Sequence, residues 1–244
     1  WVPFDKERES VSKTLEYAYD DYCIAQAARA LGKEEDYDYF LRRSLSYRNL
    51  IDPETKFMRG RDSQGRWRTP FTPVAYQGPG SVHGWGDITE GFTLQYTWYV
   101  PHDVAGHIDR VGRRLYETRL DSLFVTELPD DIPGAHDIQG RIGAYWHGNE
   151  PVYNIGSPTV EGVELRLSNG KSIRVTTENW SPENVYIRRM YVDGRVWDKS
   201  YITYDDIRDG VHLHYVMGSR PDKRRAVSAA AVPPSLPVAT RPDR

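Results

Sequence analysis

Apolar residues recur every three or four positions through the first half of the chain, the spacing of one face of an α-helix. The clearest case lies between residues 10 and 32 and includes Leu15, Ala18, Tyr22 and Ala25. Ser10 or Ser12 is the expected N-cap, because a serine oxygen can accept from a first-turn N–H group. Gly32 is the expected end, since glycine tolerates the left-handed backbone that follows many helices.

The same spacing predicts further helices before residue 125. Residues 35–50 repeat it through Phe40, Leu41 and Leu45, so the first two helices are expected to pack antiparallel. Three more segments fit a helix, ended in part by Pro101 and Gly112: 89–99, 104–113 and 115–124. Residues from about 10 to 148 are therefore expected to form antiparallel helix pairs.

The period changes to two from about residue 152 onward. Apolar and polar residues alternate around Asn169-Gly170 and again around Asp193-Gly194, two dipeptides typical of hairpin turns. Antiparallel strands are expected over 160–218. The predicted fold class is α+β, with a helical domain over 1–151, an antiparallel β region over 152–220 and a disordered, Ala/Pro/Ser-rich tail over 221–244.

Composition narrows the class of partner. The chain has 244 residues, 39% of them hydrophobic, which is enough to bury a core. Lys and Arg number 32 against 35 Asp and Glu, so the net charge of −3 gives no electrostatic reason to expect a nucleic acid. The 17 Tyr and 7 Trp suit surfaces that stack on sugar rings as well as ordinary cores.

Cys23 is the single cysteine, so no intrachain disulfide is expected, and its apolar helical surroundings predict a small buried side chain. No apolar run in the sequence is long enough to predict a membrane span. The chain opens on Trp1 without the features of a signal peptide, so this start is expected to be an internal point of a longer precursor.

Glu90 has two interpretations. It follows Thr89, a plausible N-cap, so a first-turn carboxylate favoured by the helix dipole is the simpler one, and spacing alone favours it. The second is a general acid, with Gln95 and Trp98 on neighbouring helical faces.

Two other clusters carry metal-binding residue types. Asn149 and Glu150 bring an amide and a carboxylate oxygen together before a proline, as calcium prefers, although a turn explains the pair equally well. His102, Asp103 and His107 invite a transition-metal interpretation, but residues at this spacing do not share a helical face closely.

Several long blocks, taken together and in order, resemble glycoside hydrolase family 92, the calcium-dependent exo-acting α-mannosidases. The resemblance runs from about residue 1 to 220 and rests on these blocks: "SVSKTLEYAYDDYCIAQAARALG", "MRGRDSQGRW", "TEGFTLQYTWYVPHD", "HGNEP", "IGSP", "LSNGKSIRVTTENWSPENVYI" and "YITYDDIRDGVHLHYVMG".

The resemblance implies an (α/α)6 barrel with a β-sandwich domain and an inverting hydrolysis of terminal α-linked mannose on glycans. Glu90 matches the family's general acid, and Asn149 and Glu150 match positions that help hold calcium near the sugar. It also implies a secreted or periplasmic protein.

The chain departs from the family pattern in two places. "HGNEP" runs directly into "VYNIGSP", so the block that supplies the family's catalytic base is absent, and the chain is interpreted as a partial or internally deleted member. Barrel-lining apolar surface is expected to be left uncovered. The second departure is His147-Gly148, where family members specific for terminal α-1,2-linked mannose tend to show His-Glu. Gly148 either leaves room beside the leaving group or serves a turn with positive φ.

Other functions stay open on the sequence. One is a non-catalytic carbohydrate-binding fragment in which Trp85, Trp98 and Trp146 stack on sugars without cleaving them. Another is a glycosidase of a different (α/α) barrel family.

Overall fold

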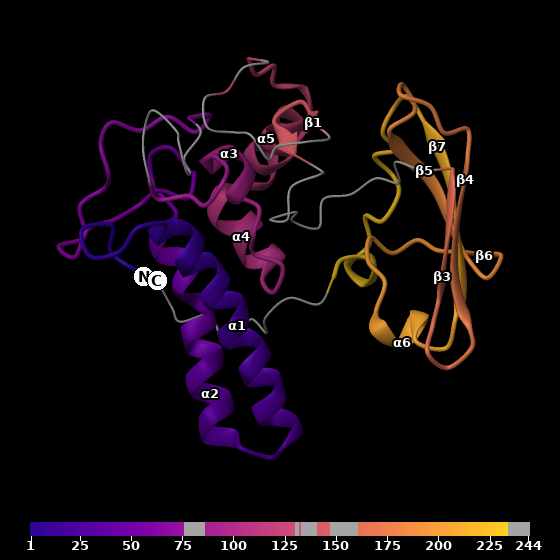
Figure 1. Ribbon diagram of the computed structural model, residues 1–244, viewed down its shortest axis with the longest axis horizontal. Helices are drawn as coiled ribbons and strands as arrows, with labels where there is room; N and C mark the ends of the chain where they lie inside the picture. Colours follow the sequence, from indigo (N-terminus) through magenta and orange to yellow (C-terminus); the bar gives the residue numbers. More distant parts are fainter. Residues whose placement is uncertain (76–85, 130–131, 133–140, 147–160, 234–244) are drawn as a thin grey trace. The chain divides into compact units, whose positions relative to one another are not determined.

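The structure is a computed structural model that describes residues 1–75, 86–129, 132, 141–146 and 161–233 (Figure 1). The chain divides into two compact units, one helical and one built on a sheet, and each is described by itself. The α+β class is confirmed. The predicted domain boundary at residues 151 and 152 lies outside the described residues.

The first unit begins with two packed helices, α1 (Ser10–Ala30) and α2 (Glu34–Arg43), followed by the 3-10 helix η1 (Ser44–Leu50). Figure 1 shows α1 and α2 running antiparallel, as the apolar spacing predicts. Gly32 ends α1 with a φ of 69°, in the left-handed region that favours glycine. The predicted helix over 35–50 is thus an α-helix that tightens into a 3-10 helix.

The start of α1 differs from the prediction. Glu9 is the N-cap and makes no side-chain capping hydrogen bond. Ser10 is already helical, and its hydroxyl donates to a carboxylate oxygen of Asp87 at 2.8 Å. Ser12 accepts from the backbone N–H of Thr89 at 2.9 Å. The serine cap was wrong because a distant segment of the chain reaches the helix N-terminus.

Three shorter helices follow: α3 (Thr93–Tyr96), α4 (Val104–Val111) and α5 (Arg113–Val125). The helix predicted over 89–99 is reduced to the four residues of α3, because Glu90 has a left-handed φ of 45° and the N-cap Phe92 is extended. The two last helices match their predictions to within a few residues.

A small hairpin in the first unit was not predicted. Strands β1 (Arg141–Ile142) and β2 (Tyr145–Trp146) pair antiparallel around Gly143, whose φ is 60°. A Cβ at Gly143 would lie 2.4 Å from the backbone carbon of Phe124, so glycine lets the hairpin approach the end of α5. Two-residue strands are too short to show an alternating pattern in the sequence.

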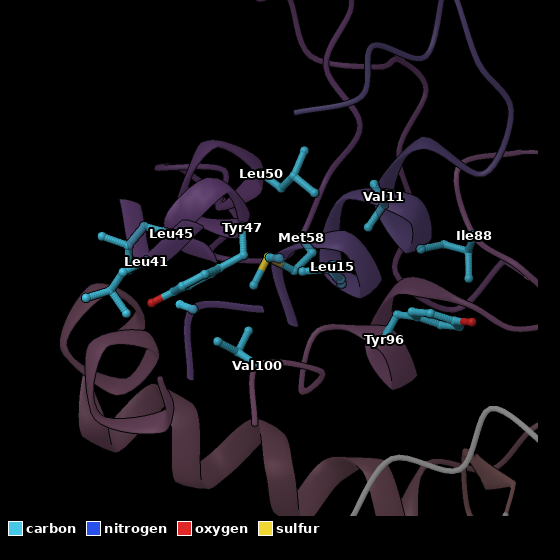
Figure 2. Packing of buried hydrophobic residues seen from close by; sticks show 12 residues of the cluster. Val11, Leu15, Leu41, Leu45, Tyr47, Leu50, Met58, Ile88, Tyr96 and Val100 are labelled. Atoms are coloured by element: carbon cyan, nitrogen blue, oxygen red, sulfur yellow. The ribbon is translucent and has the colours of Figure 1, made fainter. Parts of the chain in front are cut away.

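The core of the first unit lies between α1, α2, η1 and the segment around α3 (Figure 2). Leu15, Ala18 and Ala25 on α1 are fully buried, which confirms the predicted apolar face. Cys23 is exposed, so the prediction of a buried thiol was wrong: the residue lies one position, about 100° of helical turn, beyond that face.

Among the described residues, no helix is both long enough and apolar enough to cross a membrane.

The second unit is built on a five-stranded sheet in the order β3-β4-β7-β5-β6. Its elements, in chain order, are β3 (Gly162–Arg166), β4 (Ser172–Glu178), β5 (Tyr186–Val192), β6 (Arg195–Val196), α6 (Tyr204–Ile207) and β7 (Val211–Gly218). The two predicted hairpins, β3–β4 and β5–β6, are confirmed.

The sheet is mixed, not wholly antiparallel as predicted. Strand β7 inserts between β4 and β5, pairing antiparallel with β5 but parallel with β4. Alternation shows which residues form strands, and a hairpin turn shows how neighbours in sequence pair. Neither gives the pairing of β4 with β7, because the two strands are far apart in the sequence.

The tail also differs from the prediction over residues 221–233. The segment contains the short 3-10 helix η2 (Ala229–Ala231). The carbonyl of Ala231 accepts hydrogen bonds from both the backbone N–H and the hydroxyl of Ser200. Arg225 donates to the carbonyl of Lys199 at 3.2 Å. These contacts join the segment to the sheet unit, although its composition resembles that of disordered chains.

Candidate functional site

Glu90 lies in an irregular segment ahead of α3, not in a helix. Its φ is 45°, and α3 begins three residues later, at Thr93. The interpretation of Glu90 as a first-turn helix carboxylate is therefore wrong. A left-handed backbone is uncommon for a residue with a Cβ and persists only where the surrounding structure imposes it.

Asp87 anchors the segment that carries Glu90. The Asp87 carboxylate accepts from the Ser10 hydroxyl and forms an ion pair with Arg68, whose Nη2 lies 2.8 Å from Oδ1. Its backbone carbonyl accepts from the N–H groups of Val11 and Ser12 at 2.9 and 3.2 Å. The segment thus provides a hydrogen-bond acceptor for N–H groups in the first turn of α1, which have no acceptor within the helix.

Buried apolar residues hold Glu90 from both sides. Ile88 and Phe92 are both fully buried, while Glu90 between them is half-buried. Ile88 belongs to the same cluster as Val11 of α1 and Tyr96 of α3 (Figure 2). Glu90 is therefore presented from a short stretch whose neighbours are fixed in the core.

Polar atoms that are buried without a protein partner lie just after Glu90. Within the described part of the chain, no group pairs with the side-chain amide of Gln95 or with Nε1 of Trp98. A Cβ at Gly91 would lie 2.9 Å from Oε1 of Gln95, so the glycine leaves room for this amide beside the backbone of residue 91. Buried polar groups in native proteins usually have a partner, so unpaired ones need an explanation, of which a catalytic role or a bound water is one.

Asp103 is the centre of a second buried polar cluster. Its carboxylate accepts from the Tyr47 hydroxyl and from Nη2 of Arg48, both at 2.8 Å, and from the N–H of Gly106 at 3.1 Å as the N-cap of α4. The imidazole of His102 donates from Nε2 to the carbonyl of Ser44 at 2.8 Å. Asp103 therefore has a structural role in joining η1 to α4.

The transition-metal interpretation of His102, Asp103 and His107 is not supported. Across the described residues, no group of three or more His, Cys, Asp or Glu side chains could hold a metal ion. His107 is buried among aromatic rings, with Tyr116 at 5.2 Å and Trp98 at 6.3 Å between ring centroids. Burial lowers the pKa of His107 to about 4, which keeps the ring neutral.

Trp98 and Trp146 are buried in the first unit. Trp98 packs edge-on against Tyr116 at 4.9 Å, and Trp146 packs edge-on against Phe92 at 4.8 Å. Relative exposures of 7% and 0% leave little ring surface for a sugar in this chain. Their role in stacking remains a prediction.

The other candidate residues lie outside the described residues: Trp85, His147, Gly148, Asn149 and Glu150.

Sequence reasoning missed Asp87 and Arg68, which position the Glu90 segment. No local signal marks Asp87, because Ser10 and Arg68 lie 77 and 19 residues away in the sequence.

The sequence model of the glycosyl hydrolase family 92 catalytic domain matches residues 1–153 and 151–219. The chain belongs to glycoside hydrolase family 92. Solved structures of this family agree. The chain is 57% identical to the α-mannosidase BT3965 of Bacteroides thetaiotaomicron, solved with mannoimidazole, with a TM-score of 0.83. The inverting mannosidase BT2199 of the same organism is 26% identical, with a TM-score of 0.70.

The alignments cover 96% of this family 92 chain but only 39% of BT3965 and 41% of BT2199. An uncharacterised secreted glycosidase of Arthroderma benhamiae is 24% identical over 307 residues, which covers 96% of this chain and 39% of the relative. The chain thus spans less than half the length of these relatives.

Proposed function

We propose that this chain is part of an exo-acting α-mannosidase that removes terminal α-linked mannose from glycans with inversion. Family membership and the likeness to two mannosidases support the substrate class. The observation that carries the proposal is Glu90, whose left-handed backbone and anchored neighbours fix a half-buried carboxyl group outside any helix.

In an inverting hydrolysis, one carboxylic acid protonates the departing glycosidic oxygen while a carboxylate on the other side of the sugar activates water. The two carboxyl groups lie about 6.5–9.5 Å apart to admit that water. Glu90 is proposed as the acid. The Asp87 contacts and the buried Ile88 and Phe92 would hold its carboxyl against the leaving group, because proton transfer requires a fixed distance to the accepting oxygen.

Asn149 and Glu150 are proposed as calcium ligands. They lie outside the described residues, so the chemistry of the donor set is the test of fit: an amide oxygen beside a carboxylate suits a hard cation that prefers oxygen. A bound calcium would orient the sugar hydroxyls and act as a Lewis acid. His147 and Gly148 would then line the same site beside the leaving group.

The general base is proposed to be supplied by a segment that this chain lacks. Two features support a deletion near Pro151: the family match divides into 1–153 and 151–219, and the alignment with the Arthroderma protein runs over 307 positions, more than the 244 residues present. An acid without a water-activating partner loses most of its catalytic effect, so low activity is expected for this chain alone.

We further propose that the helices of the first unit are part of an (α/α)6 barrel and that the protein is secreted. The antiparallel packing of α1 on α2 and the neighbouring pair α4 and α5 are consistent with such a barrel. The description of the Arthroderma relative as secreted supports the location.

Glu90→Gln tests the proposal in a version of the protein that contains the family's base segment. Loss of the acid should reduce hydrolysis of mannosides with poor leaving groups by about 100-fold or more, because their departing oxygen needs a proton. An aryl mannoside with an activated leaving group should be hydrolysed at a rate much nearer to that of the unchanged protein. The ratio of the two kcat/KM values is the measurement.

Glu9→Gln is the matched control. Glu9 is also half-buried and left-handed, with a φ of 56°, but it lies at the start of α1. It should leave the ratio unchanged. If Glu90→Gln affects poor and good leaving groups equally, Glu90 is not the acid and the proposed mechanism is wrong.

A further inference from the structure

An open groove in the second unit is lined by residues that have not been considered so far. Its volume is about 570 Å³, and it is formed by the loop after β4, by β5 and by the end of β7. Trp180 supplies the exposed apolar surface, the buried Met217 also borders the groove, and Asn179, Asn184, Arg188 and Arg220 supply polar groups. The groove falls within the size range of small-molecule sites.

Arg188 is placed in the groove by an irregularity of the sheet. Ile187 pairs with Met217 and Arg189 with Val216, so Arg188 is the extra residue of a β-bulge. Bulges redirect a side chain that the regular pleat would point elsewhere. Nη1 of Arg188 donates to the carbonyl of Arg220 at 2.8 Å, which uses one of the five N–H donors that a guanidinium carries.

Gly218 provides the space that Arg188 occupies. A Cβ at this position would lie 2.8 Å from Cγ and 3.0 Å from Cδ of Arg188. Any larger residue would push the arginine out of its place. The glycine and the bulge therefore act together to lay the arginine stem across the end of β7.

Trp180 is carried by a loop with internal hydrogen bonds. Nδ2 of Asn184 donates to the carbonyl of Asn179 at 2.8 Å, and the N–H of Asn184 donates to the carbonyl of Ser181 at 3.0 Å. Asn179 adopts a left-handed φ of 59° at the start of the loop. The indole remains 38% exposed although the loop beneath it is ordered.

The chemistry of this lining points to one class of ligand. An exposed indole offers a flat apolar face of the kind that stacks on a sugar ring. The polar groups are rich in donors: two guanidinium groups and two amides line the groove. Among the described residues that line it there is no carboxylate, although Asp222 beyond the lining is close enough to interact with the charge of Arg188. Guanidinium groups bind phosphate and carboxylate oxygens more strongly than neutral hydroxyls.

We propose that this groove binds a saccharide residue that carries an anionic group. The sugar ring would stack on Trp180, and its phosphate, sulfate or carboxylate would face Arg188 and Arg220. Such a site would hold a charged part of a glycan with residues other than those of the proposed hydrolysis.

Isothermal titration calorimetry of the full chain tests this with glucose 6-phosphate, glucose and inorganic phosphate. A glucose derivative is used because the proposed catalytic site is for mannose. Glucose 6-phosphate should bind about tenfold or more tightly than either glucose or phosphate, since only it engages both the indole and the arginines. Glu90→Gln should leave this binding unchanged.

Trp180→Ala and Arg188→Gln should each weaken the binding of glucose 6-phosphate by about tenfold or more. Trp180→Tyr, which keeps an aromatic face, should retain most of it. The controls are Trp1→Ala, which removes an indole of similar exposure from the other unit, and Arg195→Gln, which removes an exposed arginine from β6. Both controls should bind like the unchanged chain, and circular dichroism melts verify that each variant is folded.

Three results would overturn the proposal. One is equal binding of phosphate and glucose 6-phosphate, which describes an anion site without a sugar. Another is weaker binding of glucose 6-phosphate by Arg188→Gln with unchanged binding by Trp180→Ala, which would also indicate an anion site without a sugar. The third is a loss of binding with Glu90→Gln, which would place the ligand at the proposed catalytic site instead.

Discussion

His107 shows how burial alone changes the chemistry of one side chain in this fold. The ring is 1% exposed, and within the described residues no group pairs with either nitrogen. Burial disfavours the charged form and lowers the pKa to about 4, while the nearby Asp103 charge acts in the opposite direction. The ring is thus neutral in the folded state at any pH well above 4.

A pH dependence of stability follows from this shift. The pKa of His107 is about 4 when folded, against 6.5 for the ordinary side chain. Between these values the unfolded chain binds a proton that the folded chain rejects, so the free energy of unfolding decreases as the pH falls through this window. This contribution should remove about 2 kcal/mol between pH 7 and pH 5.

His107→Gln should remove that component. Urea unfolding of both proteins at the two pH values, followed by circular dichroism at helical wavelengths, gives the difference directly, since other titrating groups are common to both. An equal pH dependence in the two proteins would show that His107 is accessible to protons in the folded state.

Glu90 is a residue that the sequence identified as a candidate although its local structure could not be predicted. The residue was identified by its resemblance to a family block, but its local structure was predicted wrongly. The spacing of Thr89, Glu90 and the aromatic residues after them fits a helix, whereas the structure shows a left-handed residue followed by an extended Phe92. The segment just before Glu90 is bound to α1 through Asp87–Ser10 and Thr89–Ser12, and helix propensity does not describe such long-range contacts.

The same reason explains which elements could be predicted. Helices α1, α2, α4 and α5 and the two hairpins of the sheet depend on residues close in sequence, and their periodicity and turn residues identify them. The parallel pairing of β4 with β7 and the capping of α1 by Asp87 depend on distant residues. A single sequence carries no periodic signal for either.

Asp87 is expected to fix the segment 86–92 to α1. Asp87→Ala removes the carboxylate from Ser10 and Arg68 and should destabilise the first unit by about 1–3 kcal/mol. It should also increase amide hydrogen exchange within 86–92, because the loss of these contacts frees the segment from the helix N-terminus.

Asp21→Ala is the control for this effect. Asp21 is equally buried on α1, at 6% exposure against 4% for Asp87, and pairs with Arg43 at 3.1 Å. It should cost some stability without a specific increase of exchange in 86–92. Similar exchange in this segment for both variants would mean that Asp87 does not hold it.

The family model matches this chain over nearly all of its length, from residue 1 to residue 219. The chain itself is less than half as long as the relatives that it matches. The order of a helical unit before a sheet unit follows from the change of period in the sequence, and the family from its long blocks. The candidate site is divided: Glu90 lies in the described first unit, while Asn149 and Glu150 lie outside the described residues and close to the junction of the two matched segments.

Calcium binding should therefore be weak in this chain and depend on Glu150. The affinity of an oxygen site depends on the number and charge of its ligands, and under the proposal any ligands from the segment that this chain lacks would not be available here. Glu150→Gln removes one negative ligand and should weaken calcium binding by about tenfold or more, measured by calorimetry after treatment with EDTA. Glu161→Gln, at an exposed carboxylate near the start of β3, should have no effect. Tight binding that survives Glu150→Gln would show that other residues bind the metal. The proposed position of the sugar between the metal and Glu90 would then be wrong as well.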